Sequence, residues 1–97
     1  MLAVDVDRER LREVCERYGV ASLDVFGSVA RGDAGEGSDV DLLYVLKSGT
    51  RLWFRIFDLE DELAALFNRP VDLVARKAIN KYLREQVLAE AQPLYAA

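Results

Sequence analysis

The residues of this sequence best suited to chemistry are two aspartates separated by one residue, Asp39 and Asp41. The apolar segment that follows them is typical of a strand, and residues two apart in a strand point to the same face of a sheet. The two carboxylates would therefore lie side by side, where their charges repel unless a proton or a cation offsets them. Because the chain has no His and a single Cys, a metal bound here would have oxygen ligands, which favour Mg²⁺ or Mn²⁺ over zinc.

A third aspartate, Asp72, lies inside the short apolar segment 71–74, where an isolated buried carboxylate would be costly. If this segment is a strand beside the one that begins at Asp39, the three carboxylates could hold two divalent ions about 3.5–4 Å apart. Such a site suits phosphoryl or nucleotidyl transfer. One ion lowers the pKa of an attacking hydroxyl, and the other neutralises a triphosphate and the departing pyrophosphate.

A Gly-Ser pair, Gly27 and Ser28, precedes Asp39 with ten residues between them. Glycine at a strand-to-helix turn lets the backbone approach a ligand closely, and the free N–H groups at a helix start suit a phosphate. The Ser28 hydroxyl and the Arg31 guanidinium would add contacts to phosphate. The pair is neither a Walker A loop nor a dinucleotide fingerprint. Each motif alone is typical of a turn or a solvated strand end, but chance produces the joint spacing only about once in 100,000 starting positions.

Composition narrows the class of protein. The 97 residues are 52% hydrophobic and 31% charged, which is typical of a globular protein with one domain spanning 1–97. The absence of His excludes a Ser-His-Asp triad, a Cys-His pair and His-ligated zinc. A net charge of −4 argues against a dedicated nucleic-acid binder. With no basic leader and no apolar run of ~20 residues, a cytoplasmic protein outside the membrane is expected, and Cys15 should be a buried thiol.

The apolar periodicity predicts a mixture of helices and strands. Helices are expected over residues 7–18, 52–67 and 78–91, and a short one begins at 29–31. Asp5 or Asp7 would cap the first of them. Strands are expected over residues 20–26, 39–46 and 71–74, with a short edge strand at 93–95. Residues 32–38 form a Gly-rich loop. This order predicts an α/β (α+β) fold in which one small mixed sheet is flanked by helices.

Two helix faces carry further expectations. The helix over 52–67 has a core-facing apolar stripe, and the helix over 78–91 carries Ile79, Tyr82, Leu83 and Val87 on one side, as expected for helices packed on the sheet. Trp53 and Phe57 flank the first stripe, while Phe54 points roughly opposite it. The exposed Phe beside Trp would either form part of a surface for a partner or be covered by the C-terminal helix.

The segments 26–32 (Phe-Gly-Ser-Val-Ala-Arg-Gly) and 38–43 (Ser-Asp-Val-Asp-Leu-Leu) together resemble the signature of the minimal nucleotidyltransferases. These are small members of the DNA polymerase beta-like superfamily. The segment 70–74 resembles the strand that carries the third carboxylate in this family, and 78–95 is similar to its C-terminal part. The resemblance covers nearly the whole chain and implies the polymerase beta-like nucleotidyltransferase fold.

The resemblance also implies roles for individual residues. The catalytic ligands of two Mg²⁺ ions would be Asp39, Asp41 and Asp72. Asp72 would in addition help to deprotonate the acceptor hydroxyl. The residues that bind the nucleotide, ATP, would be Gly27, Ser28, Arg31 and Ser38.

Many minimal nucleotidyltransferases are antitoxins paired with a HEPN-domain toxin. The resemblance implies a hetero-oligomer in which this chain transfers AMP to a hydroxyl of that toxin, a Tyr in this family, and neutralises it. Two alternatives stay open. The chain would be a nucleotide-binding antitoxin that acts by steric contact, or the nucleotide-binding subunit of a two-chain transferase for small molecules. The acceptor site would come from a partner or from a second copy of this chain, and the acidic charge suits docking on a basic toxin.

Overall fold

The computed structural model describes residues 6–33, 35 and 38–97. In chain order its elements are α1 (Arg8–Tyr18), β1 (Val20–Phe26), α2 (Gly27–Arg31), β2 (Val40–Leu46), α3 (Arg55–Phe67), β3 (Val71–Ala75), the 3₁₀ turn η1 (Arg76–Ala78), α4 (Lys81–Glu90) and β4 (Gln92–Ala96). This is the order that the sequence predicts, with η1 added. The expected loop at 32–38 falls partly outside the described residues.

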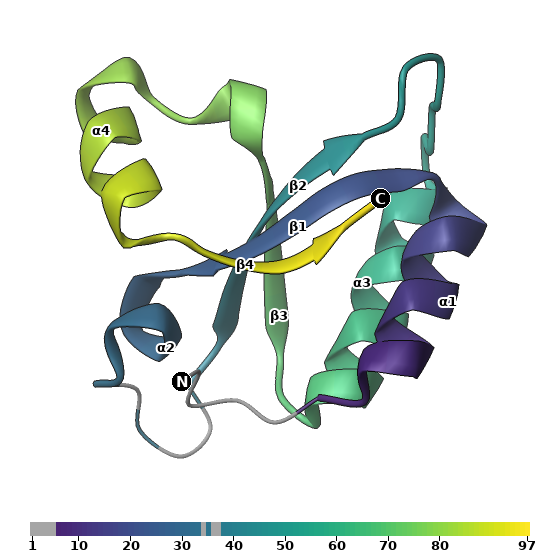
Figure 1. Ribbon diagram of the computed structural model, residues 1–97, viewed down its shortest axis with the longest axis horizontal. Coiled ribbons are helices and arrows are strands. Elements are labelled where there is room, and N and C mark those ends of the chain that lie inside the picture. The colour runs from purple at the N-terminus through teal and green to yellow at the C-terminus, as the bar shows by residue number, and fades with distance from the viewer. Residues whose placement is uncertain (1–5, 34, 36–37) are drawn as a thin grey trace.

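The four strands form one mixed sheet in the order β3-β2-β1-β4. β1 is antiparallel to β2 and to β4, whereas β2 and β3 are parallel. β2 therefore lies inside the sheet, and both Leu42 and Leu43 on its two faces are buried. β4 is the expected edge strand, a position that tolerates Pro93. Figure 1 shows α1 and α3 on one side of the sheet and α4 on the other, with α2 at the end of β1.

The main core lies between the sheet and the pair α1 and α3. α1 begins after Asp7, whose side chain accepts hydrogen bonds from two amides of the first turn; Asp5, the other cap candidate, lies outside the described residues. Cys15 is fully buried, as expected, and burial raises the pKa of its thiol to about 12. From α3, the side chains of Leu59 and Leu63 are also fully buried against this core.

The expected start of the long helix at residue 52 is wrong. α3 begins at Arg55, because Trp53 has a left-handed backbone (φ 51°) that a right-handed helix cannot contain. Leu52 is nevertheless buried at 4% exposure, as the apolar stripe predicts. In the turn before α3, the Leu52 side chain therefore packs in the core, whereas the Trp53 side chain points into solvent.

The expected helix over 78–91 is shorter and less buried than the sequence suggests. Ile79 is extended, and the Asn80 side chain accepts a hydrogen bond from the amide of Tyr82, so that α4 begins at Lys81. Tyr82 is 81% exposed and Leu83 53% exposed, which contradicts the core face proposed for them. All residues of α4 are described and none is buried. Figure 1 shows α4 on the far side of the sheet from α1 and α3. Among the helices of the described residues, none has the length and apolar character needed to span a membrane.

Candidate active site

The register of the sheet brings two of the predicted carboxylates together. β2 and β3 are paired in parallel with Asp41 opposite Asp72, and the ladder begins where the Val40 amide donates to the Pro70 carbonyl at 2.9 Å. The expectation that the third strand lies beside the second is therefore confirmed. Asp72 is exposed rather than buried, because β3 is an edge strand. Asp39 lies just before β2 and is also exposed.

Asp41 has the most perturbed environment of the three. Burial raises the pKa of its carboxyl above the usual 3.8, and the negative charges of Asp72 and Asp39 raise it further, while Arg31 acts in the opposite direction. The charges of Asp72 and Asp39 thus both act on the Asp41 carboxyl. Within the described residues, no three potential ligands lie close enough to form a closed metal site as they stand. The donor set itself, carboxylates at the mouth of a strand pair, suits a hard divalent cation that would offset this repulsion.

The turn at Gly27 lies directly against Asp41. A Cβ atom on Gly27 would be 2.4 Å from Asp41 Oδ2, and the Gly27 backbone is left-handed (φ 75°). Any other residue would meet both a steric clash and backbone strain here. The sequence predicts a glycine that allows close approach to a ligand, and the structure shows that the close approach is also to a carboxylate of the site.

The helix α2 places the rest of the Gly-Ser motif. Val29 is buried, which anchors the helix, while Ser28 is half-buried beside it. Arg31 forms ion pairs with Asp33 Oδ2 and Glu90 Oε1, both at 3.2 Å. Ser38 is half-buried in the loop before Asp39, and its amide donates to the Gly35 carbonyl at 3.1 Å. Gly27, Arg31 and the aspartates thus share one end of the sheet.

A match to known proteins is decisive for the family. The model of the nucleotidyltransferase domain family matches residues 8–94. The chain belongs to this family. It is a minimal nucleotidyltransferase, an enzyme class whose small mixed sheet and flanking helices are those described above.

Individual relatives agree with this assignment. The protein adenylyltransferase MntA of Thermococcus cleftensis is 39% identical over 79 residues, which is 81% of this chain and 79% of that protein. A solved minimal nucleotidyltransferase is 43% identical with a TM-score of 0.72, covering 89% of this chain and 87% of that one.

Two more distant structures share the fold. A toxin–antitoxin complex with AMP-PNP is 20% identical with a TM-score of 0.72, covering 95% of this chain and 75% of that one. A complex of a tri-AMPylated HEPN toxin with its MNT antitoxin, from Shewanella oneidensis, is 18% identical with a TM-score of 0.62, covering 93% and 70%.

One residue at the site of this nucleotidyltransferase is missed by the sequence reasoning. Glu90, the last residue of α4, accepts hydrogen bonds from the Gly27 amide and from Arg31. Sixty-three residues separate Glu90 from Gly27, so no local spacing could connect them. The only signal in the sequence is an acidic residue in the last turn of a helix, where the helix dipole disfavours it.

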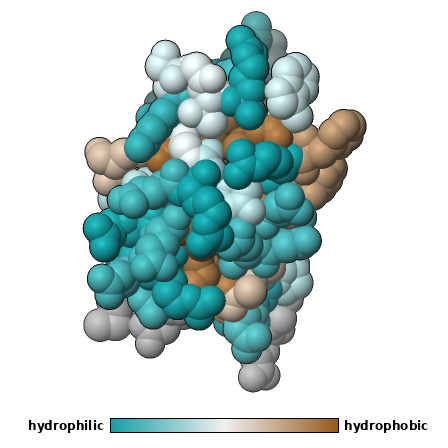
Figure 2. Space-filling view, turned by 90° about the vertical axis from the view of Figure 1, so that its right-hand side faces the viewer, coloured by the Kyte–Doolittle hydropathy of each residue, from teal (hydrophilic) through white to brown (hydrophobic). Residues whose placement is uncertain are grey.

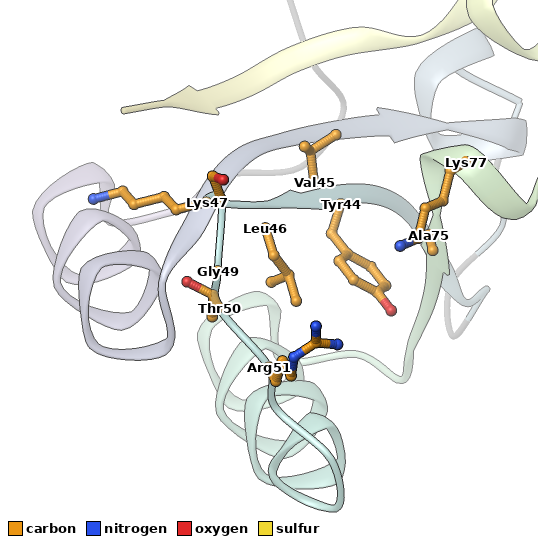
Figure 3. Close-up of a pocket in the computed structure, with 10 residues that line it drawn as sticks. Tyr44, Val45, Leu46, Lys47, Gly49, Thr50, Arg51, Ala75 and Lys77 are labelled. Carbon is orange, nitrogen blue, oxygen red and sulfur yellow. The ribbon is translucent and has the colours of Figure 1, made fainter.

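A cavity of about 400 Å³ lies away from the carboxylates, at the other ends of β2 and β3. Figure 3 shows the Tyr44 hydroxyl and the Arg51 guanidinium directed into it, whereas Lys47 points away. Tyr44 lies three residues beyond Asp41, so its side chain projects from the opposite face of the sheet. Among the described residues that line this cavity there is no carboxylate, so we keep the cavity separate from the candidate active site.

The aromatic residues before and within α3 are exposed. Trp53 is 78% exposed, Phe54 85% and Phe57 62%, so α4 does not cover them. Of the two alternatives left open by the sequence, burial under the C-terminal helix is wrong. Figure 2 views the nucleotidyltransferase from the side of α1 and α3 and shows a mostly hydrophilic face with apolar atoms protruding at its edge. These three residues are called the aromatic surface below.

Proposed function

We propose that this nucleotidyltransferase is an antitoxin that transfers AMP from ATP, with Mg²⁺, to a tyrosine hydroxyl of a HEPN-domain toxin in the cytoplasm. The observation that carries the proposal is the register of β2 and β3, which sets Asp41 beside Asp72 with the Gly27 turn against Asp41. Support comes from the 39% identical protein adenylyltransferase and from the fold shared with complexes of a HEPN toxin.

In the proposed reaction the three aspartates hold the metal ions. Two Mg²⁺ ions bound there would neutralise the triphosphate and acidify the attacking hydroxyl. The Gly27 turn and the Ser28 hydroxyl bind phosphate oxygens. Ser38, next to Asp39, also binds the nucleotide. Arg31 adds positive charge next to the triphosphate.

The proposed nucleotidyl transfer forms one bond to phosphorus and breaks another. The acceptor oxygen forms a bond to the α-phosphorus of ATP, and the bond from that phosphorus to the bridging oxygen of the β-phosphate breaks, which releases pyrophosphate. The proton of the acceptor hydroxyl passes to the Asp72 carboxylate. Asp72 suits this role because it is exposed at the edge of the sheet, where an acceptor from another molecule can reach it.

The aromatic surface is the proposed place for the toxin. Three large aromatic side chains on one exposed segment are more than a monomer usually leaves in contact with water. The acidic balance of the chain adds attraction to a basic partner. The assembly is proposed as a hetero-oligomer, and a homodimer would be its alternative.

The test is intact-mass analysis of a HEPN-domain partner after incubation with the enzyme, ATP and Mg²⁺. We expect the partner to gain the mass of one or more AMP groups on tyrosine with the wild type, and none with Asp41→Asn. Neutralisation by Asp41→Asn at the normal dose, with no transfer by the wild type, would favour steric binding instead. Consumption of ATP with an unchanged partner mass would favour a small-molecule acceptor.

A further inference from the structure

The short helix α2 carries Gly27, Ser28 and Arg31, yet it has little structure of its own. It contains five residues, and a helix of this length is not stable by itself in water. The residue that caps its start, Phe26, offers no side-chain hydrogen bond, and of its five residues only Val29 is buried. The position of α2 must therefore depend on contacts from elsewhere in the fold.

These contacts come from the junction between α4 and β4, which lies near α2 at the end of β1 (Figure 1). Glu90 Oε1 accepts a hydrogen bond from the Gly27 amide at 3.3 Å, and both of its carboxylate oxygens accept from Arg31 Nη1 at 3.2 and 3.3 Å. At the other end of α2, Gln92 Nε2 donates to the Ala30 carbonyl at 2.9 Å. Both ends of α2 are thus held by residues 62 and 63 positions later in the chain.

Glu90 also fixes the direction of the Arg31 guanidinium. Nη1 of Arg31 is bonded to Glu90, while Nε donates to Asp33 Oδ2 at 3.2 Å. The Glu90 side chain is 20% exposed and the Arg31 side chain 47% exposed, so water screens this ion pair and its role is to orient the guanidinium more than to stabilise the fold. The guanidinium is therefore held between two carboxylates, one within its own turn and one at the end of α4.

A carboxylate at this place could either orient these donors or compete with phosphate for them. The contact to the Gly27 amide is long, and the two ion pairs of Arg31 use Nε and Nη1, which leaves its Nη2 group outside both. A guanidinium has five N–H donors in a fixed plane, so a phosphate can bind Nη2 without displacing Glu90. The geometry therefore favours orientation over competition.

We propose that Glu90 is a positioning residue, which holds α2 and Arg31 in the arrangement that binds the triphosphate. The consequence for ATP rests on the proposed function, whereas the effect on α2 does not. In this proposal Glu90 does not bind the nucleotide itself. It acts through Gly27 and Arg31.

The test compares Glu90→Ala and Glu90→Gln with a control on the same helix, Glu85→Ala, whose side chain is exposed and makes none of these contacts. We expect Glu90→Ala to raise the KM for ATP about tenfold with a smaller change in kcat, since a charge-assisted hydrogen bond that orients the site is lost. Glu90→Gln should recover part of this loss, because its amide oxygen still accepts from Gly27 and Arg31. Glu85→Ala should match the wild type.

Amide hydrogen exchange gives a second readout that does not depend on ATP. In Glu90→Ala we expect faster exchange at residues 27–31 and unchanged exchange in α1. Equal acceleration in α1 would mean that Glu90 merely supports the whole fold, and unchanged exchange together with unchanged KM would overturn the proposal outright. Tighter ATP binding by Glu90→Gln would show competition instead of positioning. If the wild type neither binds nor uses ATP, the proposed function fails, while the exchange at 27–31 still decides whether Glu90 holds α2.

Discussion

At the scale of single residues, the site requires that position 27 has no Cβ atom. The sequence predicts the residue types of the site, because Gly-Ser and Asp-x-Asp have a spacing that chance rarely produces. It does not predict that the Cβ of any other residue at position 27 would lie against Asp41. That contact depends on the β1–β2 register, in which Phe26 pairs with Asp41. Glu90 could not be predicted from the sequence for the same reason, because the pairing of β1 with β4 brings it to the Gly27 turn.

Replacing Gly27 by Ala should abolish transfer and destabilise the protein by ~1–3 kcal/mol, because the added Cβ meets Asp41 and the backbone is left-handed. Gly49→Ala is the matched control. Gly49 has a comparable φ of 84°, but nothing lies within 4 Å of its Cβ position. Gly49→Ala should lose only ~1–2 kcal/mol from backbone strain and keep its activity. Urea unfolding and AMP transfer measure both effects, and equal activity of the two variants would refute the importance of the contact.

Asp41 should make stability depend on pH. Burial and the charges of Asp72 and Asp39 raise its pKa in the folded protein, so the folded state binds its proton more tightly than the unfolded state does. The stability that this contributes is fully present below the unfolded pKa and is lost as pH rises through the folded pKa. In the absence of divalent ions, Asp41→Asn should therefore have a higher Tm than the wild type at neutral pH.

This difference in Tm should shrink as the pH falls to about 3, below the usual range of an aspartate. Thermal unfolding between these two pH values measures it. Asp61→Asn, an exposed change on α3 with the same loss of charge, is the control. A wild type that is the more stable of the two at neutral pH without metal would contradict the expected repulsion among the carboxylates.

At the scale of elements, the turn before α3 is where periodicity and structure differ most. The apolar spacing continues back to Leu52, which is buried, so a pattern analysis extends the helix to it. The left-handed backbone of Trp53 instead prevents the helix from starting before Arg55. A pattern of apolar residues cannot predict such a φ angle. The faces of α4 are mispredicted for another reason. Apolar residues at helical spacing predict a covered face, but Tyr82 is 81% exposed.

The left-handed backbone of Trp53 is strained and lowers the free energy of unfolding. Because the side chain is exposed, burial of the indole ring does not offset this strain. Trp53→Gly should therefore stabilise the isolated chain by up to ~1 kcal/mol, because glycine adopts this backbone without strain. The same change should weaken binding to the toxin if the aromatic surface is the docking site. Phe54→Ala is the comparison, since Phe54 has an ordinary helical backbone. It should weaken binding with little change in stability, as measured by urea unfolding and by titration of the partner.

At the scale of the whole molecule, the parallel pairing of β2 and β3 is what creates the site. The sequence predicts a mixed sheet and the edge position of β4, and both are confirmed. The registers, by contrast, result from packing between segments far apart in the chain. The site therefore draws on β1, α2, β2, β3 and α4 together, and a ligand that bridges them should stabilise the entire fold.

Saturating Mg²⁺ with ATP should accordingly raise the Tm. At a ligand concentration one hundred times Kd, the gain is about 2.7 kcal/mol, and each kcal/mol raises the Tm of a domain of this size by roughly 4–8 °C. Asp39→Asn should remove most of the shift, and EDTA should do the same for the wild type. A shift that survives both changes would place the nucleotide somewhere other than the carboxylate cluster.

The contacts of Glu90 and Gln92 with α2 also have a consequence for folding during synthesis. A ribosome makes the Gly27 turn 63 residues before it makes Glu90, and the Ala97 amide, which donates to the Ala21 carbonyl at 2.8 Å, comes later still. A nascent chain therefore carries the phosphate-binding turn and all three aspartates well before α2 can be fixed in place. We expect such a chain to be inert toward nucleotide until the segment that carries Glu90 and Gln92 has emerged and contacts α2.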